Sequence, residues 1–146
     1  MSAATVAALG RVPLFADLNE DELERVASVF KERRFSEGET VIQQGSGAAA
    51  FFVIDSGEAT VSVDRVEQRV LQAGDYFGEM ALIDAGTRTA TVTASTDLVC
   101  SGVTFWDFRP LVEANGVIGW KLLQSLIQIY RSERAQPPAS AGGPRP

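Results

Sequence analysis

The chain has 146 residues, enough for one domain with one core, and its net charge of −6 argues against nucleic acid or an anionic membrane as a partner. It contains no histidine, which excludes imidazole-based metal sites and general bases; its one cysteine, Cys100, cannot form an internal disulfide, and no apolar run approaches the roughly 20 residues of a membrane span. We therefore expect a cytoplasmic, non-catalytic domain without a metal.

The first predicted element is a helix near the N-terminus. Residues 18–30, LNEDELERVASVF, place Leu23, Val26 and Phe30 at helical spacing. Asn19 is the expected N-cap, because it precedes three acidic residues that suit the first turn of a helix. Residues 1–11 are expected to form an N-terminal extension, and the domain itself is expected to span residues 12–134.

The middle of the chain, from about Lys31 to Trp106, predicts strands. Short runs rich in Val, Ile, Phe and Thr alternate with glycine-bearing turns at Gly38, Gly45, Gly47, Gly57, Gly74 and Gly86. Residues 51–63, FFVIDSGEATVSV, predict two strands joined by a tight turn at Ser56 and Gly57. Residues 89–95, TATVTAS, alternate polar and apolar side chains with the period of a strand. This pattern favours a sandwich, a jelly roll or a small barrel.

The C-terminal part predicts two helices followed by a tail. Residues 106–114, WDFRPLVEA, form the first, and residues 117–134, VIGWKLLQSLIQIYRSER, form the second. The last twelve residues, AQPPASAGGPRP, contain no core-forming side chains, so residues 135–146 are expected to be a disordered tail.

The last helix carries more apolar surface than one core requires. At roughly 100° per residue its apolar side chains span about 200°, whereas packing on one core needs a stripe only a little over 100° wide. One half of this arc carries Trp120, Leu123, Ile127 and Tyr130, and the other carries Ile118, Leu122, Leu126 and Ile129. The excess favours a second apolar contact, although a deep groove within the domain would also bury such a helix.

The stretch FGEMALIDAGTRTA, residues 77–90, carries the most specific chemistry in the sequence. Gly78 permits close backbone approach, and residues 79–83 suit a helical turn whose N–H groups can face an anion. The Arg88 guanidinium matches the geometry of a phosphate, and the Glu79 carboxylate can accept a hydrogen bond from a sugar hydroxyl. These groups suit a 3′,5′-cyclic nucleotide, although short Gly-Glu turns followed by a solvated arginine also occur without a ligand. Elements of a P-loop or a dinucleotide fingerprint are absent from the sequence.

This stretch resembles the phosphate-binding cassette of the cyclic-nucleotide-binding domain family, found in regulatory subunits of cAMP-dependent kinase, bacterial cAMP receptor regulators and cyclic-nucleotide-gated channels. The family's pieces match Phe77-Gly78-Glu79, the small-apolar helix 80–83 and Arg88-Thr89-Ala90 at the usual spacing. The likeness extends over roughly residues 12–134. It implies a mainly β fold with flanking helices: a jelly-roll, or double-stranded β-helix, barrel with one N-terminal and two C-terminal helices.

The resemblance also implies the ligand-binding residues. Arg88 would pair with the cyclic phosphate, and Glu79 would accept from the ribose 2′-hydroxyl. Backbone amides would come from Gly78, Ala81 and Thr89, and Met80 belongs to the same ligand-binding turn. The Thr89 hydroxyl would reach the phosphate or the purine, and we expect cAMP to be preferred over cGMP.

Other positions leave alternatives open. Val61, Val63 and Leu71 either line a pocket for the base or belong to the core. The family often has an acid after the glycine near Gly45, where this chain has Ser46, which puts the shape of that loop in doubt rather than the cassette.

The expected function is that of a sensor in which a cyclic nucleotide acts through the C-terminal helix on an effector protein in trans. For the second apolar face of that helix the family suggests two contacts, the base of the nucleotide or the helix of a second subunit, giving a homodimer through residues 117–134. Three alternatives stand beside this function: a metal-dependent cupin-like barrel, which the lack of histidine opposes; an N-terminal fragment of a transcription regulator; and a degenerate domain that serves as a scaffold.

Overall fold

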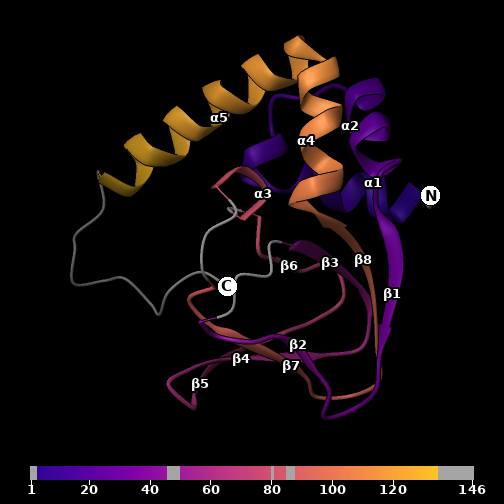
Figure 1. Ribbon diagram of the computed structural model, residues 1–146, viewed down its shortest axis with the longest axis vertical. Helices are drawn as coiled ribbons and strands as arrows, with labels where there is room; N and C mark the ends of the chain where they lie inside the picture. Colours follow the sequence, from indigo (N-terminus) through magenta and orange to yellow (C-terminus); the bar gives the residue numbers. More distant parts are fainter. Residues whose placement is uncertain (1–2, 46–49, 80, 85–87, 135–146) are drawn as a thin grey trace.

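The computed structural model describes residues 3–45, 50–79, 81–84 and 88–134. Helices gather at one end of the molecule and strands at the other (Figure 1). In chain order the elements are α1 (Ala3–Gly10), the 3-10 turn η1 (Pro13–Phe15), α2 (Glu20–Ala27), β1 (Lys31–Phe35), β2 (Thr40–Ile42), β3 (Ala50–Ser56), β4 (Ala59–Val63), β5 (Val66–Leu71), β6 (Tyr76–Phe77), α3 (Ala81–Asp84), β7 (Thr91–Ala94), β8 (Leu98–Thr104), α4 (Phe105–Ala114) and α5 (Gly116–Arg134).

The N-terminal helices pack on the domain core. Asn19 is the N-cap of α2, as predicted, and it forms a reciprocal capping box with Glu22 through two hydrogen bonds of 2.9 Å. The α2 residue Val26 is fully buried. Leu9 of α1 is also fully buried, so a helix within the first eleven residues contributes to the same core.

The strands form two antiparallel four-stranded sheets in the orders β1-β8-β3-β6 and β2-β7-β4-β5. The tight turn between β3 and β4 contains Gly57 at a φ of 92°, where a Cβ would overlap the Asp97 carbonyl oxygen. Along β7 the side chains of Val92 and Ala94 are buried, which confirms the alternation in this segment. The mainly β arrangement with flanking helices is confirmed; the two sheets do not close on each other, and the jelly-roll connectivity stays a prediction.

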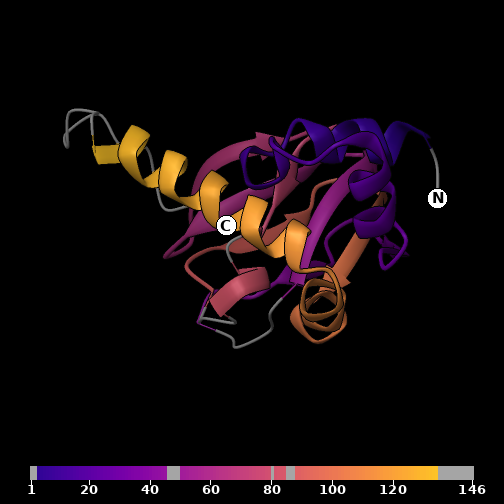
Figure 2. The same ribbon diagram turned by 90° about the horizontal axis from the view of Figure 1, so that it is seen from above.

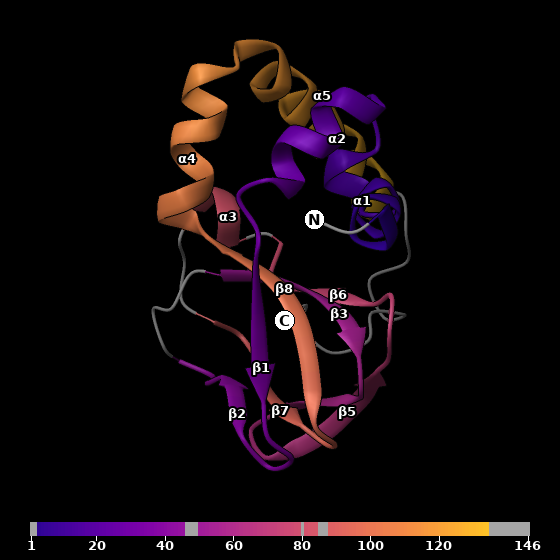
Figure 3. The same cartoon turned by 90° about the vertical axis from the view of Figure 1, so that its right-hand side faces the viewer.

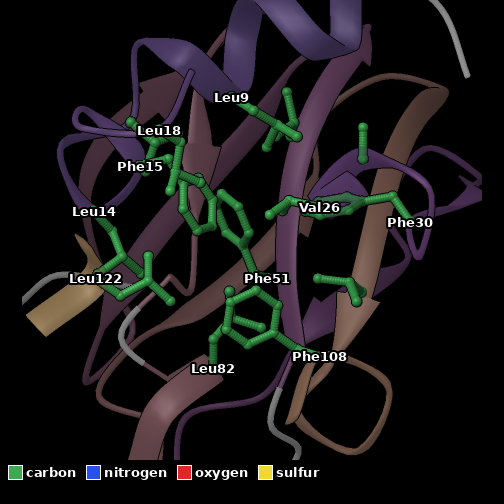
Figure 4. Packing of buried hydrophobic residues seen from close by; sticks show 14 of the residues in the cluster. Leu9, Leu14, Phe15, Leu18, Val26, Phe30, Phe51, Leu82, Phe108 and Leu122 are labelled. Carbon is green, nitrogen blue, oxygen red and sulfur yellow. The ribbon is translucent and has the colours of Figure 1, made fainter. Parts of the chain in front are cut away.

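Two hydrophobic clusters hold these layers together. One lies between the two sheets and contains Phe35, Ile42, Phe52, Ile54, Ala59, Val61, Leu71, Phe77, Ala90, Val92, Ala94, Leu98 and Cys100. The other lies between the helical end and the outer face of the sheet β1-β8-β3-β6. Figure 3 shows the helical end above the strands. In this second cluster Phe51 of β3 meets Phe15 and Phe30, and Leu122 approaches from α5 (Figure 4).

Helix α5 packs on the domain with one face and leaves the other exposed. Ile118 and Leu122 are buried in the helical core, whereas the opposite half exposes Trp120, Leu123, Ile127 and Tyr130. Viewed from above, the helix crosses the helical end and its C-terminal turns extend past the rest of the fold (Figure 2). The two predicted halves are therefore confirmed. Within the described residues, none of the helices has the length and apolar character needed to cross a membrane.

Candidate functional site

The segment after β6 is shaped by an anchor and a glycine. Phe77 is fully buried and stacks on Phe52 at a ring distance of 5.2 Å, which fixes the end of the strand. The chain then turns at Gly78, whose φ of 88° lies in the left-handed region. A Cβ at this position would overlap the Ala50 carbonyl oxygen and the Nη2 atom of Arg88. The backbone of Gly78 thus lies directly against the arginine, and no side chain fits between them.

Arg88 is held from both ends. Only 5% of its surface is exposed, and its Nη2 donates a hydrogen bond of 2.6 Å to the carbonyl oxygen of Ala50. Its own carbonyl oxygen accepts a 2.9 Å hydrogen bond from the Gly45 N–H. A guanidinium withdrawn from water in this way interacts with an anion more strongly than one on the surface, because the local dielectric constant is lower.

Glu79 follows Gly78 and borders a hollow. The residue is 7% exposed, and it lines a cavity of about 470 Å³ together with Pro13, Arg69, Val70, Leu71, Asp75 and Tyr76. This volume falls in the range of about 300–1,000 Å³ that holds small-molecule ligands. The acid therefore faces a space large enough for a sugar.

The remaining cassette residues have different surroundings. The Ala81 N–H donates to the Gly78 carbonyl oxygen at 3.1 Å, so in this conformation that amide closes a turn. Ala81 is buried, and Thr89 is exposed. Met80 lies outside the described residues. The structure thus packs Gly78 against Arg88, with Glu79 next in the chain, and the ligand contacts expected of all six residues stay predictions.

A second, apolar hollow of about 590 Å³ is lined by residues of α3, α4 and α5. Its walls include Leu82 and Ile83 of α3, Phe105 of α4, and Trp120 and Leu123 of α5. The exposed half of α5 thus begins in this groove. Since α3 begins two residues after Glu79, the groove and the cassette involve neighbouring parts of the chain.

The candidate base-binding residues are divided. Val61 and Leu71 are buried between the sheets, and Val63 packs against that cluster. Leu71 also borders the cavity beside Glu79, whereas Val61 does not. Among the described residues, no group of three or more metal-ligating side chains comes together.

Sequence reasoning missed two partners of Arg88. Ala50 and Gly45 contact the arginine through main-chain atoms, which any residue type possesses. No residue type signals such a contact, and both positions are far from Arg88 in the chain.

Comparisons with known proteins agree with this geometry. A family model described as "Cyclic nucleotide-binding domain" matches residues 32–115. The cAMP-dependent protein kinase regulatory subunit of Emericella nidulans is 38% identical over 92 residues, which cover 62% of this chain and 22% of that protein. The cGMP-dependent protein kinase, isozyme 1, of Drosophila melanogaster is 37% identical over 112 residues, or 71% of this chain and 15% of that one. The chain therefore spans less than a quarter of the length of these relatives.

A solved structure shares the fold over most of the chain. The N-terminal domain of a transcriptional regulator from Streptomyces coelicolor A3(2) superposes with a TM-score of 0.80 at 24% identity, covering 89% of this chain and 97% of that one. The family match spans more than half of the sequence, and the cassette within it has the geometry described above. The chain is a member of the cyclic nucleotide-binding domain family.

Proposed function

We propose that this chain is a sensor that binds a 3′,5′-cyclic nucleotide at the Gly78, Glu79 and Arg88 cluster. The observation that carries the proposal is a buried arginine packed against the side-chain-free backbone of Gly78, with the buried acid Glu79 next in the chain and bordering a cavity. Membership of the family supports the ligand class, and the named relatives include a cAMP-dependent and a cGMP-dependent protein.

The chemistry assigns a separate task to each charged group. The cyclic phosphate carries one negative charge, which Arg88 neutralises through charge-assisted hydrogen bonds. Glu79 would repel the phosphate, so it has to face the sugar, where its carboxylate accepts from the 2′-hydroxyl. The cavity that Glu79 borders supplies room for this contact. The chain's own part is binding and orientation, without a catalytic step.

Base preference is the finer part of the proposal. We propose that cAMP binds more tightly than cGMP, with Thr89 as the residue closest to the choice. Thr89 is exposed and follows Arg88 directly, so its hydroxyl can turn toward the phosphate or the purine. Replacing Thr89 with alanine should therefore change the ratio of the two affinities. An unchanged ratio would remove Thr89 from the account of base preference.

Coupling to α5 is the proposed output. Trp120 and Leu123 face α3 across the apolar groove, and α3 is continuous with the cassette. Ligand binding that draws the cassette inward would favour one position of α5 over another, by as much as the ligand's affinity differs between the two states. The signal then passes to an effector protein in trans.

The exposed face of α5 is the proposed homodimer contact. Trp120, Leu123, Ile127 and Tyr130 are 50–64% exposed and recur at steps of three, four and three residues, the spacing of a helix–helix seam. A chain with this seam is expected to sediment as a dimer. Leu123→Glu should give a monomer, while Gln124→Glu, an exposed polar position one residue along, should not. A monomeric wild-type chain would exclude the dimer.

Two alternatives to a stand-alone sensor differ in their support. One structural neighbour is a domain of a transcriptional regulator, which favours the hypothesis that this sequence is part of such a protein. A scaffold that has lost its ligand is the other, and the burial of Glu79 and Arg88 speaks against it, because buried charges are costly to keep without a use.

Calorimetric titration with cAMP and cGMP tests the proposal. Arg88→Ala should weaken binding by about 2–4 kcal/mol through the lost charge-assisted contacts, and Glu79→Ala by somewhat less. Arg34→Ala is the matched control, because Arg34 of β1 is exposed and forms its ion pair with Glu32 on the same strand. Wild-type affinity in both cassette variants would place the site elsewhere.

A further inference from the structure

Gln44 and Gly45, just after β2, join two parts of the fold that the cassette chemistry does not connect. On one side they contact the tip of the β4–β5 hairpin, and on the other they contact the segment that carries Arg88. The neighbouring residue Gln43 is exposed, and within the described part of the chain no recorded hydrogen bond joins it to the hairpin tip or to the Arg88 segment.

The hairpin tip is strained. Its two central residues, Asp64 and Arg65, have φ values of 51° and 67°, although neither is glycine. Tight hairpin turns of this kind favour Asn-Gly or Asp-Gly, since an arginine in the left-handed region is unfavourable by about 1–2 kcal/mol. Some outside contact is therefore needed to hold this tip in place.

Gln44 supplies that contact through both ends of its amide. Its Nε2 donates to Asp64 Oδ1 at 2.9 Å, and its Oε1 accepts from the Asp64 N–H at 2.8 Å. The pair of hydrogen bonds fixes the glutamine side chain as well as the turn. Because β4 pairs with β7, the hairpin belongs to the same sheet as β7, the strand that begins three residues after Arg88.

The main chain of the same two residues reaches the cassette. The Gln44 N–H donates to Thr91 Oγ1 at 2.9 Å, and the Gly45 N–H donates to the Arg88 carbonyl oxygen at 2.9 Å. The Arg88 side chain is bound 38 residues away in sequence by the Ala50 carbonyl oxygen. The arginine is thus held at its backbone by Gly45 and at its guanidinium by Ala50.

We propose that Gln44 is a positioning residue for Arg88: its side chain locks residues 44 and 45 to the hairpin, and the locked backbone fixes the arginine for its anion. The effect on ligand affinity rests on the proposed function, whereas the effect on the Arg88 backbone does not. Within the described residues the side-chain hydrogen bonds of Gln44 go to Asp64 and not to the cassette, so its proposed effect on the ligand passes through Arg88.

The test distinguishes a role of Gln44 in positioning Arg88 from a role in stabilising the hairpin alone. Gln44→Ala is made in the wild-type chain and in an Asp64→Asn/Arg65→Gly background, whose turn sequence is stable by itself and still offers both partners to Gln44. Gln43→Ala is the control. Each variant is titrated with cAMP and with cGMP, and hydrogen exchange of the Gly45 amide is followed without nucleotide.

The expected result is a loss of affinity of about tenfold for Gln44→Ala in both backgrounds, the scale of one lost hydrogen bond, with faster exchange at Gly45. Gln43→Ala should change neither. Full affinity of Gln44→Ala in the stable-turn background would overturn the proposal, because Gln44 would then act only on the hairpin. Unchanged affinity in the wild-type background would overturn it too.

Hydrogen exchange keeps this proposal apart from the proposed function. If the wild-type chain binds neither nucleotide, the sensor proposal fails. The positioning role of Gln44 is then tested by hydrogen exchange of the Gly45 amide alone. Faster exchange at Gly45 in Gln44→Ala then supports the positioning role of Gln44, and unchanged exchange refutes it.

Discussion

Replacing Gly78 with alanine is the sharpest perturbation of the cassette. The added Cβ would overlap the Ala50 carbonyl oxygen and Arg88 Nη2. The carbonyl belongs to the backbone of β3 and cannot move easily, so the arginine has to give way. The substitution should therefore break the hydrogen bond between Arg88 Nη2 and Ala50 without removing either partner.

The magnitude follows from two contributions. Alanine at a φ of 88° is unfavourable by about 1–2 kcal/mol. Forcing an extra methyl group into a packed site adds about 1–3 kcal/mol, so Gly78→Ala should lower the free energy of unfolding by about 2–5 kcal/mol. Gly38 offers a matched control, because its φ is 87° but a Cβ there would meet no atom within 4 Å. Gly38→Ala should carry the first contribution alone.

Urea denaturation measures the stability difference, and titration with cAMP measures the functional one. Gly78→Ala should bind at least about tenfold more weakly than Gly38→Ala, since only the former displaces the guanidinium. Equal stability and equal affinity of the two variants would refute the packing of Gly78 against Arg88.

Three further predictions concern other parts of the fold. The Lys121 ammonium and the Asn19 N–H lower the pKa of Glu22 from its ordinary 4.5. The Glu22 carboxylate therefore stabilises the fold fully above pH 4.5, and this stabilisation is lost as the pH falls through the lowered pKa. Glu22→Gln should thus lower the free energy of unfolding, measured with urea, at neutral pH. Between neutral pH and about pH 3 the variant should lose less of this free energy than the wild type does. With Trp106→Phe leaving Trp120 as the sole tryptophan, saturating cAMP should shift its selectively excited emission to shorter wavelength if α5 closes; a fixed spectrum opposes movement. Burial, followed by the Asp55 charge, raises the pKa of Cys100 to about 12, so its thiol should react with a disulfide reagent only after unfolding.

Features set by local sequence were predictable. The Asn19 cap depends on residues three apart, and the alternation in β7 depends on the period of a single strand. The cassette was also predictable as a segment, because Gly78, Glu79 and Arg88 lie within eleven residues of one another. A short span limits how far apart the chain can hold them.

Features set by long-range main-chain contacts were not predictable. Arg88 is fixed by the backbone of Gly45 and Ala50, and nothing in their residue types indicates a partner. The hairpin at Asp64 and Arg65 lacks the usual glycine, and its support from Gln44 appears only when distant segments are placed side by side. The full burial of Leu9 likewise depends on where the sheet lies, which the composition of α1 does not encode.

The most direct measurement is a calorimetric titration of the wild-type chain with cAMP, with cGMP and with 5′-AMP, which has the same base as cAMP but no cyclic phosphate. The account predicts saturable binding of the cyclic nucleotides at one site per chain, with cAMP the tighter, and much weaker binding of 5′-AMP. A folded chain that binds neither cyclic nucleotide, or that binds 5′-AMP as well as cAMP, would contradict it.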